Sequence, residues 1–129
     1  MAGSCSDYGE NALLDYLCAS SLQLALLLQD PQDDNSGILE PTDDADYERE
    51  PVAAADWGAA AAGVITTVNA ITFCAAASDF STVSHWGLYD STETGAGNLL
   101  VHGDLSTARD VTGGETVTFA AGKITITLT

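Results

Sequence analysis

The clearest hydrophobic pattern lies at the C-terminal end of the chain, where apolar and hydroxyl side chains alternate. The order there is Ile124, Thr125, Ile126, Thr127, Leu128 and Thr129. Successive side chains of a strand point to opposite faces, so the apolar set is expected to face the interior and the threonines to face solvent. This pattern predicts a strand over residues 124–128.

Further short segments rich in β-branched and aromatic residues follow Trp57 and are separated by turn residues. They are residues 64–66, 70–73, 81–89, 98–103 and 116–119. The turn cluster 90–97 predicts a hairpin between its two flanking strands, and residues 120–123 join the last two strands. Several short strands at this spacing predict a mainly β fold, an antiparallel β-sandwich or open barrel.

The N-terminal part carries a different periodicity. Residues 8–19 predict a short helix that Asp7 caps, with Leu13, Leu14 and Leu17 on one face. Residues 22–28 form a leucine-rich run that is interpreted as a first strand. A continuous helix through Leu28 is the alternative, because leucine and alanine favour helices, and periodicity does not decide between the two.

Residues 30–50 form an acidic segment with nine carboxylates, and prolines stand at positions 31, 41 and 51. This composition predicts a long solvated loop, followed by a short edge strand within residues 47–52. The 129 residues are therefore expected to form one domain. It would comprise a lead-in and helix (1–20), the acidic loop (30–50) and a β-rich core (57–129).

The charge balance excludes some classes of partner. Nineteen carboxylates face three basic residues, which gives a net charge of −16. Direct binding to nucleic acid or to an anionic membrane surface is not expected, because both require a basic protein. Salt at about 1 M would screen the self-repulsion within about 3 Å. The charge therefore fits a halophilic host, and equally an acidic surface that keeps the protein soluble.

Neither a membrane span nor a disulfide framework is expected. The most apolar run, residues 17–28, is too short and too polar to cross a bilayer, and no basic region precedes it as in a signal peptide. The three cysteines, Cys5, Cys18 and Cys74, include no C-x-x-C pair. We expect Cys18 and Cys74 to be buried free thiols, with a Cys5–Cys18 bridge as the alternative.

No catalytic motif is present, so no enzymatic activity and no obligatory cofactor are expected. His85 and His102 lie in the two strands of the predicted hairpin and could face each other, but no metal-binding spacing supports a site there. The acidic loop offers oxygen ligands for a structural Ca²⁺ or Mg²⁺ ion, although it lacks the residue order of an EF-hand. The candidate ligands are Asp30, Asp33, Asp34 and Asp43, with Asn35 beside them.

Aromatic residues are few, and some of them are candidates for contacts with other proteins. Tyr47, Trp57 and Tyr89 are the contact candidates, because aromatic side chains are enriched at interfaces. Trp86 and Phe119 are expected to pack in the core instead.

The order of several segments carries a family resemblance. These segments include ALLDYL at 12–17, LQLAL at 22–26, residues 30–37, VSHWGLYD at 83–90, GNLL at 97–100 and residues 105–122. In this order the chain resembles the small tail-fibre-like or minor structural proteins of tailed bacterial and archaeal viruses. Residues 42–56 depart from the family pattern, because they are more acidic and richer in alanine.

The resemblance implies a component of the virus particle and supplies no catalytic residue. The leading hypothesis is a non-enzymatic structural protein on the outside of a tailed-virus particle, either capsid-decorating or part of a tail fibre or other appendage. Synthesis in the host cytoplasm would fit the free cysteines. Expected partners are further copies of the chain, as a trimer, and capsid or tail proteins.

Two other functions remain open from the sequence. One is a host-surface or carbohydrate-binding β-sandwich module of the virion, which requires Trp57 or Tyr47 to be exposed beside the acidic loop. The other is a small metal-dependent enzyme built on His85 and His102.

Overall fold

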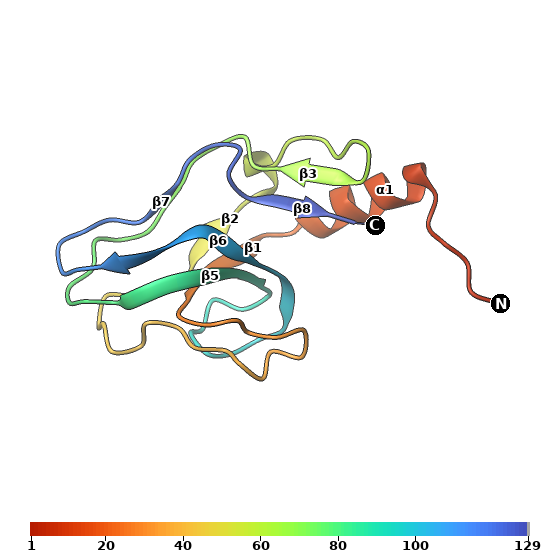
Figure 1. Ribbon diagram of the computed structural model, residues 1–129. Helices are drawn as coiled ribbons and strands as arrows, with labels where there is room; N and C mark the ends of the chain where they lie inside the picture. The colour runs from red at the N-terminus through yellow and green to blue at the C-terminus, as the bar shows by residue number, and fades with distance from the viewer. Residues whose placement is uncertain (129) are drawn as a thin grey trace. The chain divides into compact units, whose positions relative to one another are not determined.

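The computed structural model describes residues 1–128, so the outward orientation expected for Thr129 lies outside it (Figure 1). Its elements are α1 (Asp7–Ala19), β1 (Leu22–Leu27), β2 (Glu50–Val52), the 3₁₀ turn η1 (Ala54–Asp56), β3 (Val64–Thr66), β4 (Ile71–Thr72), β5 (Ser81–Tyr89), β6 (Leu99–Val111), β7 (Thr118–Phe119) and β8 (Thr125–Thr127). The predicted class is confirmed: the chain is mainly β, with antiparallel sheets and one N-terminal helix.

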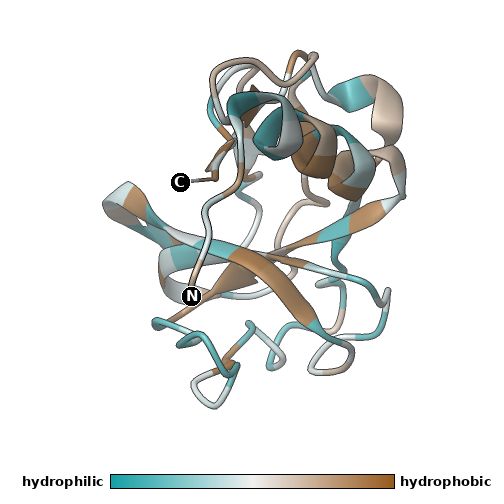
Figure 2. Ribbon diagram, turned by 90° about the vertical axis from the view of Figure 1, so that its right-hand side faces the viewer, coloured by the Kyte–Doolittle hydropathy of each residue, from teal (hydrophilic) through white to brown (hydrophobic). Residues whose placement is uncertain are grey.

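The chain divides into two compact units. The first contains residues 1–21, residues 53–71 and the chain from Phe119 onward, and the second contains residues 22–52 and 72–118. Figure 2 shows apolar segments in brown along the strands, whereas the loops are mostly teal or pale.

The second unit is built on a four-stranded antiparallel sheet in the order β2-β1-β5-β6. All six residues of β1 are buried, which explains why its sequence is a continuous leucine-rich run and does not alternate. In the register with β5, Leu24 pairs with Leu88 and Leu26 with Trp86. The strand interpretation of residues 22–28 is therefore confirmed, and the continuous helix is wrong.

The hairpin of β5 and β6 is longer than its sequence pattern indicated. β5 has the predicted bounds, but β6 runs on to Val111 because its polar second half pairs with the start of β5, as in the pair Thr82–Asp110. Gly103 pairs with Trp86, and a Cβ at position 103 would lie 2.8 Å from the indole ring. Glycine at this position therefore lets β6 pass close to the tryptophan.

The opposite edge of this sheet is the short strand β2, which lies within the predicted range 47–52. Its pairing with β1 places Leu22 opposite Val52 and Gln23 opposite Pro51. Proline lacks an N–H group, and an edge strand tolerates this because one side of the strand has no partner in the sheet.

The first unit combines α1 with the β3–β8 pair. Ser6, and not Asp7, caps the helix: its backbone is extended and its Oγ accepts a hydrogen bond from the Gly9 N–H at 3.1 Å, while Asp7 is already helical. Leu14 and Cys18, four residues apart, are buried, whereas Leu13 is 55% exposed and does not share the inner face as predicted.

The C-terminal alternation is confirmed: Ile124 and Ile126 are buried and both threonines of β8 that flank Ile126 are exposed, while Leu128 is partly exposed. The partner of this strand was not evident from sequence. β8 pairs with β3, opposing Ile126 to Ile65, and β7 pairs with β4. β7 and β8 are consecutive in sequence but lie in different sheets.

Candidate functional site

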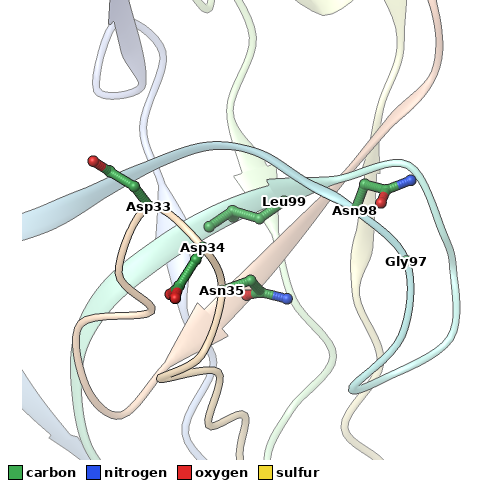
Figure 3. Close-up of a pocket in the computed structure, with 6 residues that line it drawn as sticks. All are labelled: Asp33, Asp34, Asn35, Gly97, Asn98 and Leu99. Atoms are coloured by element: carbon green, nitrogen blue, oxygen red, sulfur yellow. The ribbon is translucent and has the colours of Figure 1, made fainter.

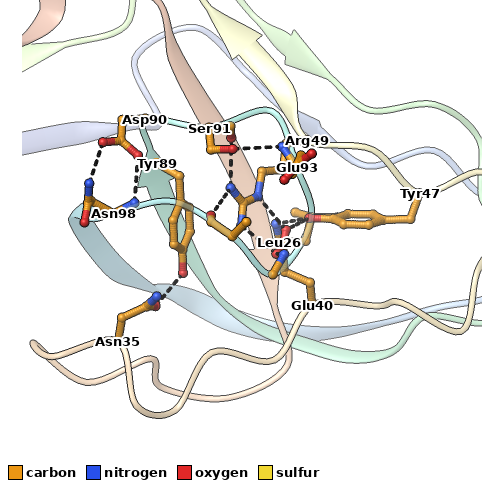
Figure 4. Close-up of polar contacts among 12 residues, drawn as sticks. Leu26, Asn35, Glu40, Tyr47, Arg49, Tyr89, Asp90, Ser91, Glu93 and Asn98 are labelled. Carbon is orange, nitrogen blue, oxygen red and sulfur yellow. Dashed lines mark hydrogen bonds and ion pairs between the residues drawn. The ribbon is translucent and has the colours of Figure 1, made fainter.

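The polar residues of the second unit gather around a buried ion pair between Glu40 and Arg49. Arg49 Nη2 donates to Glu40 Oε2 at 2.8 Å and Arg49 Nε donates to Oε1 at 3.0 Å, so the guanidinium binds the carboxylate with two parallel hydrogen bonds (Figure 4). Both side chains are 0% exposed. Such a pair is costly to desolvate and persists only when the remaining donors and acceptors are also satisfied.

The remaining donors of Arg49 bind the loop between β5 and β6. Its Nη1 donates to the carbonyl oxygens of Ser91 at 2.8 Å and Ala96 at 2.9 Å. The guanidinium carbon also lies 4.0 Å from the centroid of the Tyr89 ring, in a cation–π arrangement. Arg49 therefore connects the acidic segment to the loop 90–98.

The Glu40 carboxylate accepts two further hydrogen bonds besides those from Arg49. The Tyr47 hydroxyl donates to Glu40 Oε1 at 2.8 Å, and the Gly95 N–H donates to Oε2 at 2.7 Å. The Tyr47 oxygen also accepts the N–H of Leu26, in the middle of β1, at 3.0 Å. A carboxylate with this many donors is held in place and is not free to act as a general base.

The electrostatics of the two tyrosines follow from their burial. Burial raises the pKa of Tyr89 to about 12, and the negative charge of Glu40 contributes in the same direction. Burial and Glu40 also raise the pKa of Tyr47 well above its usual value. Both hydroxyls stay protonated at neutral pH and serve as hydrogen-bond donors.

A small open pocket lies beside this network, between the loop that follows β1 and the start of β6. It has a volume of about 240 Å³ and is lined by Asp33, Asp34, Asn35, Gly97, Asn98 and Leu99 (Figure 3). The Tyr89 hydroxyl donates to Asn35 Oδ1 at 2.9 Å and so fixes one wall. Hydrogen bonds from Asn98 to Asp90, at 2.7 and 2.8 Å, fix the other and lower the pKa of Asp90.

Two of the predicted cation ligands lie next to His102 on β6. Its Nε2 is 2.9 Å from Asp33 Oδ1, and its Nδ1 is 3.9 Å from Asp30 Oδ1. Asp34 instead accepts the Ser36 N–H at 3.0 Å, and hydrogen bonding to Ser36 lowers its pKa. Asp43 is exposed in a later turn. Within residues 1–128 no three His, Cys, Asp or Glu side chains are grouped as metal ligands, so cation binding stays a prediction.

The expected facing of the two histidines is wrong. In the β5–β6 register His85 pairs with Asp104, and His102 pairs with Gly87. The pairing irregularity between the turn and the two histidines lies at Leu88 and Tyr89, and the His85 Nδ1 lies 2.8 Å from the Ser84 hydroxyl. The two histidines are therefore not directly opposite one another, and no group of three metal-ligating side chains is present within residues 1–128.

The three aromatic residues expected to contact other proteins are buried instead. Tyr47, Trp57 and Tyr89 are 8%, 7% and 0% exposed, so they pack inside the chain and do not present a contact surface. Tyr47 stacks on Phe73 and meets Phe80 edge-on. Trp86 and Phe119 are buried, as expected.

The cysteines are all free thiols. Cys18 is buried as predicted, and burial raises its pKa to about 11. Cys74 is exposed, contrary to expectation, because it follows the end of β4 on the outward side of the alternation whose inward position is Phe73.

Sequence reasoning missed the central pair of the site. The acidic segment looked uniformly solvated, yet Glu40, Asp44 and Arg49 within it are buried. One signal was available: Arg49 is one of only three basic residues in the chain, and it stands among nine carboxylates. Which carboxylate it pairs with depends on how the loop folds.

The comparison with known families decides what kind of protein this is. A family model described as Podophage GP4 fiber I protein gp80 matches residues 4–127. The chain belongs to this family. The gp80 fibre family confirms the expected relation to tail-fibre-like phage proteins and makes the chain a structural fibre component of the virion.

Two further observations accompany the family assignment. No curated protein matches the chain in sequence. In the part of the chain that the structure describes, no helix has the length and apolar character needed to span a membrane.

Proposed function

We propose that this chain is a non-enzymatic fibre or appendage protein on the outer surface of a tailed-virus particle, made in the host cytoplasm. The match to the fibre family over residues 4–127 carries this proposal. The arrangement around Glu40 and Arg49 supports it, since these buried polar groups are engaged with one another and with the backbone, as in a rigid building block.

Self-association is part of the proposal, with a trimer as the expected state. A small domain buries a limited share of its surface, and particle proteins gain stability from contacts with further copies or with neighbouring capsid or tail proteins. The net charge of −16 argues against direct contact with the packaged genome.

The experiment is to locate the chain on purified particles. Mass spectrometry of particles banded in a density gradient should detect it, and gold-labelled antibodies should mark the fibres. Label spread over the capsid would favour a decorating role instead. Absence of the chain from infectious particles would refute the proposal.

Trp57 and Tyr47 are buried and do not supply the exposed aromatic ring expected of a carbohydrate-binding module. The polar pocket beside β6 supports this second candidate, a host-surface or carbohydrate-binding module, through other residues. Its carboxylate and amide side chains, Asp33, Asp34, Asn35 and Asn98, are suited to hydrogen-bonding sugar hydroxyls. A glycan array should then show saturable binding that is lost in Asp33→Ala and kept in Asp43→Ala, an exposed aspartate outside the pocket. Binding that survives Asp33→Ala would count against this candidate.

A further inference from the structure

Trp57 and Thr67 face each other in the first unit, and each buries a polar atom that lacks a hydrogen-bond partner. Among residues 1–128, the buried side-chain atoms in this condition are the indole Nε1 of Trp57 and the Oγ1 of Thr67. Trp57 is 7% exposed and Thr67 is 2% exposed. Nearly all buried donors and acceptors in folded proteins are paired with other protein groups or with ordered water, so both atoms require a partner.

The backbone around the two residues brings their side chains close together. Trp57 and Thr67 are directly opposite one another in an antiparallel bridge. The hydrogen bonds on either side of this pair run from the Gly58 N–H to the Thr66 carbonyl at 2.9 Å and from the Val68 N–H to the Asp56 carbonyl at 2.8 Å. Trp57 and Thr67 therefore form a non-hydrogen-bonded pair, the type in which opposite side chains share one face and approach most closely, with Cα atoms about 4.5 Å apart.

The main-chain groups of Thr67 already have partners on the other side of its strand. Its N–H donates to the Ile124 carbonyl at 3.0 Å, and its carbonyl accepts the Gly122 N–H at 2.7 Å. The unpaired groups are therefore an indole N–H, which can only donate, and a hydroxyl, which can donate and accept. A ligand that satisfies both must accept a hydrogen bond from the indole, bond to the hydroxyl and be small enough for a buried position.

We infer that one water molecule binds between Trp57 Nε1 and Thr67 Oγ1. Its oxygen accepts the indole N–H, and the same molecule bonds to the threonine hydroxyl. Buried waters make about three hydrogen bonds, and the neighbouring Asp56 and Thr66 carbonyls each keep a second lone pair for the third. The water thereby joins the turn 53–58 to the segment 66–68.

The charge of the chain favours water over a small anion at this site. Chloride would also accept hydrogen bonds from an indole N–H and a hydroxyl. A net charge of −16 opposes the burial of a further negative charge, whereas a neutral water carries no such cost.

The indole proton of Trp57 tests the site in the unmodified chain. The chain has two tryptophans and therefore two indole N–H signals in its NMR spectrum, which Trp57→Phe assigns. The Trp57 proton should show a nuclear Overhauser contact at the water frequency. A spectrum without this contact would overturn the inference, and this measurement needs no variant that might fold differently from the wild type.

A second measurement counts the water itself, because a hydroxyl proton that exchanges with solvent gives the same NMR contact. Magnetic relaxation dispersion of ¹⁷O detects long-lived water and not hydroxyl groups. Its amplitude should fall by the equivalent of one water in Thr67→Val, with an unchanged circular dichroism spectrum, and stay at the wild-type value in Thr67→Ser. Thr72→Val is the matched control, because the Thr72 hydroxyl lies 3.2 Å from Thr118 Oγ1 at an exposed position. An amplitude that Thr67→Val leaves unchanged would overturn the inference.

Replacement of NaCl by sodium sulfate at the same ionic strength separates water from chloride. The Trp57 indole signal should keep its position, since sulfate is too large for a buried site between two side chains. A signal that shifts with the chloride concentration would overturn the water in favour of an anion. None of these outcomes affects the proposed place of the chain on the virus particle.

Discussion

Arg49 and Glu40 form a two-pronged ion pair, with contacts of 2.8 and 3.0 Å, in which neither side chain reaches solvent. Three segments meet at this pair: Glu40 and Arg49 come from the acidic segment, Leu26 of β1 is reached through Tyr47, and Ala96 lies in the loop between β5 and β6. One arginine thus orders two loops that have no regular secondary structure of their own.

Removing one partner of this pair should destabilise the chain strongly. Glu40→Gln and Arg49→Met each leave a buried group without its counter-charge or donors, and we expect a loss of about 3–5 kcal/mol in the free energy of unfolding. Urea titration followed by tryptophan fluorescence measures it.

Two comparisons separate this effect from a general loss of charge. Glu48→Gln, at an exposed position in the same segment, should change stability by less than about 0.5 kcal/mol. The double variant Glu40→Gln/Arg49→Met should lose less than the sum of the single variants. Additive losses would show that the two side chains do not act as a pair.

The Tyr47 hydroxyl should contribute to the stability of the fold independently of the packing of its ring. Tyr47→Phe keeps the packing on Phe73 and Phe80 but leaves the Leu26 N–H without its acceptor. We expect a cost of about 1–3 kcal/mol by urea titration. Tyr16→Phe, at an exposed position on α1, should be neutral, and an equal loss in both variants would contradict this role.

Salt should stabilise the folded chain. Between 0.1 and 1 M NaCl the screening length falls from about 10 Å to about 3 Å, which removes most of the repulsion from a net charge of −16. We expect the Tm to rise by roughly 3–8 °C, or about 1–2 kcal/mol. Sorbitol at equal osmolarity controls for effects that are not ionic. A Tm that stays constant or falls in NaCl would argue against a protein adapted to salt.

The free energy of unfolding should fall at alkaline pH, and deprotonation of the buried Cys18 thiol should set the pH at which this fall begins. The pKa of Cys18 is raised from 9.0 to about 11 and that of Tyr89 from 10.0 to about 12, chiefly by burial. The folded state binds these two protons more tightly than the unfolded state does. Their contribution to the free energy of unfolding is therefore complete below the unfolded pKa values and is lost as the pH rises from about 9 towards 12. The urea midpoint should therefore be level near pH 8 and fall above pH 9.

Two matched variants test whether Cys18 causes the first part of this alkaline loss of stability. In Cys18→Ala the fall should begin about one pH unit later than in the wild type, near the unfolded pKa of tyrosine. Cys5→Ala, which removes an exposed thiol, should follow the wild-type curve. Identical onset in all three proteins would show that Cys18 does not contribute.

Much of the fold was predictable because local patterns specify local structure. The alternation at 124–128, the strand 81–89 and the helix that ends at Ala19 are read from side-chain periodicity and turn residues, and all three are present. The extension of β6 through 104–111 was not predictable, because those residues are polar and exposed and are strand-like only by pairing with β5.

The candidate site was less predictable for a related reason. Composition indicated that residues 30–50 form an acidic loop, and most of them lie outside helices and strands. Whether a given carboxylate is solvated or buried depends on partners far along the chain. The Glu40 carboxylate accepts a hydrogen bond from the Gly95 N–H, and the Asp44 carboxylate accepts one from the Ser78 N–H.

By itself, the sequence determined the β-rich class, the acidity and the positions of most strands, since these depend on composition and short-range periodicity. The order of its segments carried the resemblance to tail-fibre-like proteins, and the family model matches residues 4–127. Only the tertiary structure decided that β8 pairs with β3, that Tyr47 and Tyr89 point inward, and that Arg49 selects Glu40 among nine neighbouring carboxylates. These relationships join residues distant in sequence. Their free energy comes from desolvation and hydrogen bonding, which exist only once the segments have been brought together.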